Sequence, residues 1–232
     1  IALSGMSVAF PVGVGLALVL GVLVNYFSAA KGDPRFIFLG VALIAAAIVM
    51  NGIAYKKAQT GQRKTPTKGI LIAVAAGVIM AFFYRFVAAS MDLDDFVSPA
   101  PGKLTPYTAV FIFATGVFAS NFLFNTVAMK RPVEGPPVRI ADYFRGGVRT
   151  HLVGILGGTI WCIGTSLSMI ASGKAGAAIS YGLGQGATLV SALWGIVIWK
   201  EFRGAPRVSA RLNAGMFVLF LVGLGLLIYA GA

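Results

Sequence analysis

The sequence predicts an all-α integral membrane protein. Hydrophobic residues make up 58% of its 232 residues and charged residues only 11%, whereas about a quarter of the residues in a soluble domain are charged. Seven stretches are apolar over about the 20 residues that a helix needs to cross a bilayer. We therefore predict membrane spans at residues 7–27, 36–55, 69–91, 107–129, 152–171, 176–199 and 214–230.

The first residues continue this apolar pattern. The chain begins at Ile1 rather than at a methionine, and no charged segment of the kind that opens a signal peptide precedes the apolar residues 1–8. We expect residues 1–6 to be the end of an earlier span, so that further N-terminal spans belong to the complete protein.

Basic residues are divided unequally between the two sides of the predicted spans. Of the 19 Lys and Arg residues, 4 lie in loops on one side, 14 lie in loops on the other, and Arg85 lies within a span. Because cytoplasmic loops are enriched in Lys and Arg, loops 56–68, 130–150 and 200–212 are predicted to be cytoplasmic and the C-terminus external. The same enrichment accounts for the net charge of +12 without nucleic-acid binding.

Residues for catalysis or metal binding are scarce. The sequence has one histidine, His151, and one cysteine, Cys162, and it contains neither HExxH nor a GxxxxGK[ST] phosphate-binding loop. A zinc site or a Ser-His-Asp triad needs more such residues. We therefore predict no enzyme activity, no metal and no cofactor, and we expect any transport to be passive or driven by a gradient.

Two short matches indicate an internal repeat. Residues 21–24 (GVLV) resemble residues 195–198 (GIVI), and the turns that follow are GDPR at 32–35 and GAPR at 204–207. The two spans are five apart and therefore cross the membrane in opposite directions, as in the inverted repeats of secondary transporters. The prediction is a ten-span protein, in which residues 1–55 end the first five-helix repeat, 56–68 form a cytoplasmic linker and 69–232 form the second repeat.

The predicted span 176–199 contains candidate substrate contacts at Tyr181 and Gln185, because polar groups within a membrane are commonly functional. Its glycines at 182, 184 and 186 permit close helix packing. Alternatively, the helix is irregular and lines a cavity, where the Gln185 amide both donates and accepts hydrogen bonds. Further hydroxyls in this span belong to Ser180, Thr188 and Ser191.

Two other spans add candidate contacts. Asn121 and Asn125 are four residues apart and share a helix face, so they bind either a solute or a neighbouring helix. Trp161 and Thr165 have the same spacing in the next span, and Trp161 lies too deep for an interfacial aromatic belt, which favours a stacking role. By contrast, Asn25, Tyr26, Asn51 and Tyr55 lie at span ends and are predicted to be interfacial anchors.

Arg85 is the charged residue that lies well inside a predicted span. It precedes the outer boundary at Met91 by six residues, or about 9 Å. One interpretation is that the guanidinium reaches the outer headgroups. The other follows from the lean of side chains toward the helix N-terminus, which would direct Arg85 deeper, into a central cavity where it binds carbonyl oxygens of a substrate.

The sixth predicted span resembles the ureide permease family, which belongs to the drug/metabolite transporter superfamily and is related to glucose and rhamnose permeases. The resemblance is most specific over residues 158–203. Its features are LVSALWGI at 189–196, EFR at 201–203, Ile160, Trp161, Gly164, Leu167, Gly173 and Gln185, and, earlier in the chain, Gly21 with NYF at 25–27.

The resemblance implies a ten-span multi-pass permease in a plasma or bacterial inner membrane that takes up heterocyclic nitrogen compounds such as allantoin or nucleobases, with protons as the coupling ion. Two features depart from the family. The linker 56–68 is short and has no phosphate-loop motif, and no carboxylate lies in mid-membrane. A sugar permease of the same superfamily is one alternative, and an integral membrane receptor or scaffold is another. The sequence predicts a small-molecule substrate and contact with the lipid bilayer, but no oligomeric state.

Overall fold

Helices make up the regular structure of the described chain. The computed structural model describes residues 9–58, 67–133 and 135–231, and within these ranges six helices are long and apolar enough to cross a membrane. They are Phe10–Ser28, Pro34–Ala58, Gly69–Ser90, Pro106–Lys130, Val148–Ala175 and Arg207–Ala230. The predicted all-α integral membrane fold is confirmed. The proposed end of an earlier span, residues 1–6, and most of the linker 56–68 lie outside the described residues.

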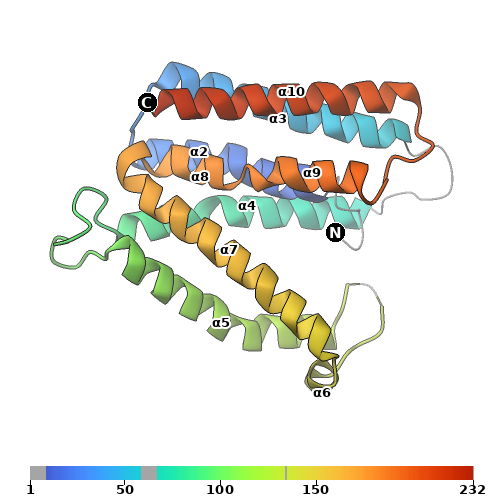
Figure 1. The fold of residues 1–232 in the computed structure, drawn as a ribbon, viewed down its shortest axis with the longest axis horizontal. Helices are drawn as coiled ribbons and strands as arrows, with labels where there is room; N and C mark the ends of the chain where they lie inside the picture. Colours follow the sequence, from blue (N-terminus) through green and yellow to red (C-terminus); the bar gives the residue numbers. More distant parts are fainter. Residues whose placement is uncertain (1–8, 59–66, 134, 232) are drawn as a thin grey trace. The chain divides into compact units, whose positions relative to one another are not determined.

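The helices form two compact units (Figure 1). Unit 1 consists of Ile1–Ala89 and Ala171–Ala232, and unit 2 consists of Ser90–Ile170. Unit 1 contains η1 (Phe10–Val14), α2 (Gly15–Ser28), α3 (Pro34–Ala58), nearly all of α4 (Thr67–Ser90), α8 (Ala177–Gly184), α9 (Ala187–Val197) and α10 (Arg207–Ala230). Unit 2 contains α5 (Pro106–Lys130), α6 (Ile140–Phe144) and most of α7 (Val148–Ala175). Segments that are far apart in the sequence therefore share unit 1.

The predicted span 176–199 is divided into two shorter helices. α8 ends at Gly184 and α9 begins at Ala187, so that Gln185 and Gly186 form a helix break. Neither part has the length of a span, which is why six long helices occur in the described chain where seven spans were predicted. Glycine costs about 1 kcal/mol relative to alanine within a helix, and three closely spaced glycines weaken the helix at this point.

α3 and α10 pack side by side in antiparallel directions (Figure 1). At one end, the Asp33 N–H donates to the Ala230 carbonyl at 3.0 Å. Toward the other end, the Asn51 Nδ2 donates to the Asn213 Oδ1 at 3.3 Å. Between them, a Cβ atom on Gly40 would lie only 2.8 Å from the Gly223 carbonyl oxygen. Glycine at position 40 thus allows the two backbones to approach closely.

The two turns that the sequence comparison paired have similar backbone conformations. Gly32 and Gly204, the first residues of GDPR and GAPR, have positive φ angles of 93° and 80°. Proline then opens each following helix, because α3 begins at Pro34 and Pro206 is the N-cap of α10. Glycine tolerates this left-handed conformation and proline suits a helix start. A turn with a positive-φ glycine followed by a proline therefore precedes both α3 and α10, the two helices that pack together.

Two of the predicted interfacial anchors are wrong. Asn25 is 1% exposed and Asn51 is 0% exposed, so neither side chain lies at a membrane surface. The Asn25 Nδ2 donates to the Gly21 carbonyl at 2.7 Å within α2, and Asn51 bonds to α10 as described above. The prediction relied on the position of each asparagine near the end of a span. Whether the side chain is buried depends on which helices pack against that span, and the sequence of a single span does not reveal this.

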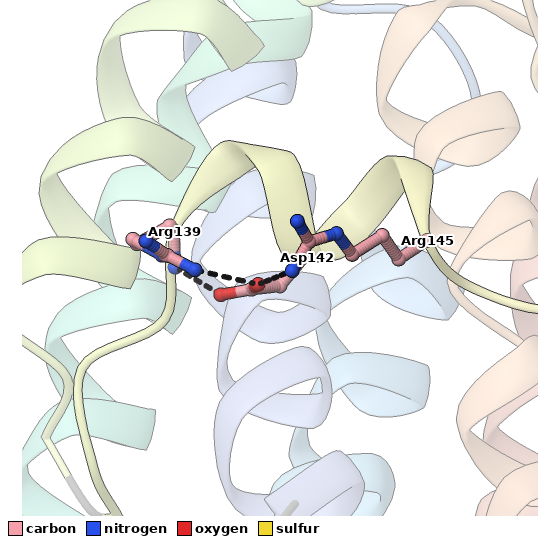
Figure 2. Close-up of polar contacts among 3 residues, drawn as sticks. All are labelled: Arg139, Asp142 and Arg145. Carbon is pink, nitrogen blue, oxygen red and sulfur yellow. Dashed lines mark hydrogen bonds and ion pairs between the residues drawn. The ribbon is translucent and has the colours of Figure 1, made fainter.

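The loop between α5 and α7 contains the short helix α6, where one carboxylate lies between two arginines (Figure 2). The Asp142 Oδ1 is 3.6 Å from an Arg139 nitrogen and 3.9 Å from an Arg145 nitrogen. The Arg139 N–H also donates to the Asp142 Oδ2 at 3.0 Å. Because both arginine side chains are largely exposed, these ion pairs contribute little stability. The loop remains strongly basic, in keeping with its predicted cytoplasmic position.

Asp92 organises the loop between α4 and α5. Its Oδ1 accepts hydrogen bonds from the N–H groups of Asp94 and Asp95, both at 3.1 Å. Its Oδ2 accepts one from the Ala100 N–H at 2.9 Å. These N–H groups, that of Ala100 above all, favour the charged carboxylate and lower the pKa of Asp92 below its ordinary value, with a smaller contribution from Lys103.

We expect Asp92→Asn to loosen this loop at neutral pH, because an amide nitrogen would face one of the N–H donors. Amide hydrogen exchange at residues 94–100 measures the change, and Asp94→Asn is the matched control. In the wild type, the lowered pKa means that the carboxylate stabilises the loop above about pH 3.8 and that this stabilisation is lost as the pH falls through the folded-state pKa. Equal exchange in both variants would contradict this role.

Candidate functional site

The helix break in unit 1 is held by a short series of tight hydrogen bonds. The Gln185 N–H still donates to the Tyr181 carbonyl at 3.1 Å, as in an α-helix. The next bonds span only three residues, from the Gly186 N–H to the Leu183 carbonyl at 2.9 Å and from the Thr188 N–H to the Gln185 carbonyl at 3.0 Å. Such tightened turns within a membrane helix often accompany functional sites.

A second irregular segment, η1, packs against α9 in the same unit. It is a π-helical turn, in which the Gly15 N–H donates to the Phe10 carbonyl. Pro11 lies within it, and proline lacks the N–H of a regular helix. A Cβ atom on Gly15 would lie 3.9 Å from the Thr188 Cγ2, so the methyl group of Thr188 faces the junction of η1 and α2.

The two irregular segments occupy corresponding positions in the predicted repeat. The offset that aligns Gly21 with Gly195 also aligns η1, Phe10–Val14, with residues 184–188, which contain the helix break. Interrupted segments at corresponding positions of two halves are a pointer to the binding site in transporters with inverted repeats. The sequence signal for η1 lies in Pro11, Gly13 and Gly15, and it was not part of the predicted site.

Tyr181 joins three helices of unit 1. Its ring lies against Gly21 of α2, where an added Cβ atom would overlap ring carbon atoms. Its hydroxyl donates to the Met80 carbonyl of α4 at 3.1 Å. The rings of Tyr84 and Phe83 lie 5.3 and 6.0 Å from it, centroid to centroid. Tyr181 is 1% exposed, so in this conformation its contacts are with protein.

The other predicted contacts of unit 1 differ in exposure. Gln185 is half-buried at the helix break, where it is the C-cap residue of α8. Arg85 is exposed on α4, between the buried Tyr84 and the exposed Phe86. The structure therefore places Gln185 in the helix break, whereas Arg85 lies on a surface of the unit.

Four predicted contacts belong to unit 2. On α5, the Asn125 Nδ2 donates to the Asn121 Oδ1 at 2.6 Å, and the Asn121 Nδ2 donates to the Val117 carbonyl at 3.0 Å. Both side chains are exposed on a membrane-length helix. On α7, the Trp161 ring lies 6.1 Å from the Phe113 ring of α5, and Thr165 follows one turn later and is half-buried. The two asparagines form a polar strip, and Trp161 contacts α5 while remaining half-exposed.

Comparisons with a family profile and with individual known proteins point to the same family. The sequence profile of the family described as Ureide permease matches residues 56–230. Three proteins of Arabidopsis thaliana are similar over about 70% of the chain: Ureide permease 5 is 30% identical over 169 residues, Ureide permease 2 is 27% identical over 160 and Ureide permease 1 is 26% identical over 165. The aligned part is 40–42% of each relative's length. No solved structure matches the chain.

Proposed function

This chain belongs to the ureide permease family, and from that premise we propose that it forms part of a secondary transporter for ureides such as allantoin, or for nucleobases. The observation that supports the proposal best is the helix break between α8 and α9 together with the π-helical turn η1, which packs against α9. A permease family implies a small-molecule substrate and a multi-pass membrane protein. Because the chain spans about two fifths of the length of its relatives, the activity of the whole protein is a proposal.

The proposed architecture has ten spans in two inverted five-helix repeats. Residues 1–55 would end the first repeat, 56–68 would link the repeats, and 69–232 would form the second. The proposal is supported by the antiparallel packing of α3 on α10 and of α2 on α8, since each pair joins corresponding helices of the predicted repeats. The similar turns at Gly32 and Gly204 agree with this correspondence.

The proposed contacts match the chemistry of a planar heterocycle, whose edge carries hydrogen-bond donors and acceptors and whose face carries π electrons. The Gln185 amide suits the edge, as do the amides of Asn121 and Asn125, and the Trp161 ring suits the face. Arg85 would bind carbonyl oxygens. Tyr181 and Thr165 complete the set of proposed contacts. A location in the plasma or bacterial inner membrane is a further prediction, whereas proton coupling rests on the family resemblance alone.

Uptake experiments test this function. Cells that make the complete protein should accumulate labelled allantoin or uracil faster than cells with an empty vector, and should accumulate labelled glucose no faster. Glucose uptake alone would favour the sugar permease. Binding of allantoin without uptake of any solute would favour a receptor.

A further inference from the structure

Thr188 has a buried hydroxyl that finds no hydrogen-bond partner among the residues that the structure describes. The residue is 1% exposed and lies in the first turn of α9, directly after the helix break. A buried hydroxyl without a partner is destabilising because it has lost its hydrogen bonds to water. The unpaired hydroxyl therefore needs a physical explanation.

The helix break supplies that explanation. Hydroxyls in membrane helices commonly donate to the carbonyl four residues earlier, and this chain shows the pattern in Thr115 with Phe111 at 2.8 Å and in Thr159 with Ile155 at 2.9 Å. For Thr188 the corresponding carbonyl belongs to Gly184, the last residue of α8, on the other side of the break. The carbonyl three residues earlier, on Gln185, already accepts the Thr188 N–H.

The surroundings favour an acceptor as the missing partner. The N-terminal end of a helix carries a partial positive charge, and Thr188 is in the first turn of α9. In transporters, the N-terminal ends of half-helices commonly face electron-rich groups of the substrate. The methyl group of Thr188 faces the junction of η1 and α2, and η1 corresponds to the break in the predicted repeat.

We propose that Thr188 binds the transported solute by donating its hydroxyl hydrogen to a carbonyl oxygen of that solute when the helix break opens. This inference rests on the proposed function and adds a residue to it. In the structure the hydroxyl is buried and has no hydrogen-bond partner among the described residues. When the helix break opens, the carbonyl of a bound solute can accept a hydrogen bond from the Thr188 hydroxyl. Solute binding then favours the open conformation by the free energy of this hydrogen bond.

Thr188→Val tests the proposal because valine keeps the shape of threonine and lacks the hydroxyl. We expect the apparent KM for allantoin uptake to rise about tenfold, the effect of one lost hydrogen bond. The midpoint of thermal unfolding in detergent should stay the same or rise, since an unpaired hydroxyl has been removed. Thr188→Ser should retain a KM within about twofold of the wild type. Thr115→Val, which removes a paired hydroxyl on α5, is the control for a general effect of the substitution.

Two results would overturn the assignment of Thr188. One is a wild-type KM in Thr188→Val while the wild type transports allantoin normally. The other is a lowered unfolding midpoint in Thr188→Val but not in Thr115→Val, because it would mean that the Thr188 hydroxyl has a structural partner in the resting protein. Absence of uptake by the wild type for every carbonyl-bearing solute would instead overturn the proposed function together with this inference.

Discussion

Replacing Gly21 with alanine should prevent the helices of unit 1 from packing as they do. The added Cβ atom would overlap the Tyr181 ring, which cannot simply move aside. The hydroxyl of that ring bonds to the Met80 carbonyl on α4, and the rings of Tyr84 and Phe83 lie beside it. Overpacking of a core commonly costs 1–3 kcal/mol and occasionally more. Because this ring joins α2, α4 and α8, we expect a loss of at least about 3 kcal/mol.

Thermal unfolding in detergent measures the effect, and Gly52→Ala provides a matched control. Gly52 also lies within a membrane helix of unit 1, but a Cβ atom there would meet nothing within 4 Å among the described residues. Its replacement should be neutral or stabilise the helix by up to about 1 kcal/mol. Similar unfolding midpoints for the two variants would show that Tyr181 is not held between α2 and α4 as described.

Gln185→Leu should strongly reduce substrate uptake and leave the protein folded in the membrane. The side chain is half-buried at the helix break, and leucine keeps much of its volume but none of its hydrogen-bonding groups. Loss of a two-way hydrogen-bonding amide from a desolvated site should lower uptake by about 10- to 100-fold. Uptake at limiting solute concentration measures this effect, and equal surface expression is the necessary check. Wild-type affinity in this variant would remove Gln185 from the site.

Trp161→Ala tests whether the Trp161 ring stacks on the face of the heterocycle. Its matched control is Trp194→Ala, since the two tryptophans are 51% and 50% exposed and both lie in helices. Loss of a stacking ring should weaken solute affinity in Trp161→Ala alone. Equal losses in both variants would point to a general effect of removing an exposed indole.

Sequence reasoning identified the spans because a bilayer imposes a length and an apolar composition on each helix separately. It could not tell which helix covers which face. Asn25 and Asn51 show this limit, because both look like span-end anchors, whereas the packed structure buries Asn25 and pairs Asn51 with Asn213 of α10. Tyr181 shows it too, since its burial follows from a glycine 160 positions earlier in the chain.

The candidate site could also be predicted from the sequence only in part. The glycines at 182, 184 and 186 were compatible either with close helix packing or with an irregular helix, and the structure shows a break between α8 and α9. The unpaired Thr188 hydroxyl was not predictable, because it depends on where the break falls relative to the carbonyl of Gly184. Whether Arg85, Asn121, Asn125, Trp161 and Thr165 contact a solute stays a prediction that the uptake experiments address.

The pairing of α3 with α10 has a consequence for biogenesis. About 150 residues separate the end of α3 at Ala58 from the start of α10 at Arg207. At 5–20 residues per second, a ribosome needs roughly 7–30 s to synthesise that segment. During this time the face of α3 around Gly40 and the buried amide of Asn51 lack their partner. The Asn51 amide must therefore find a hydrogen-bond partner other than lipid hydrocarbon until translation delivers α10.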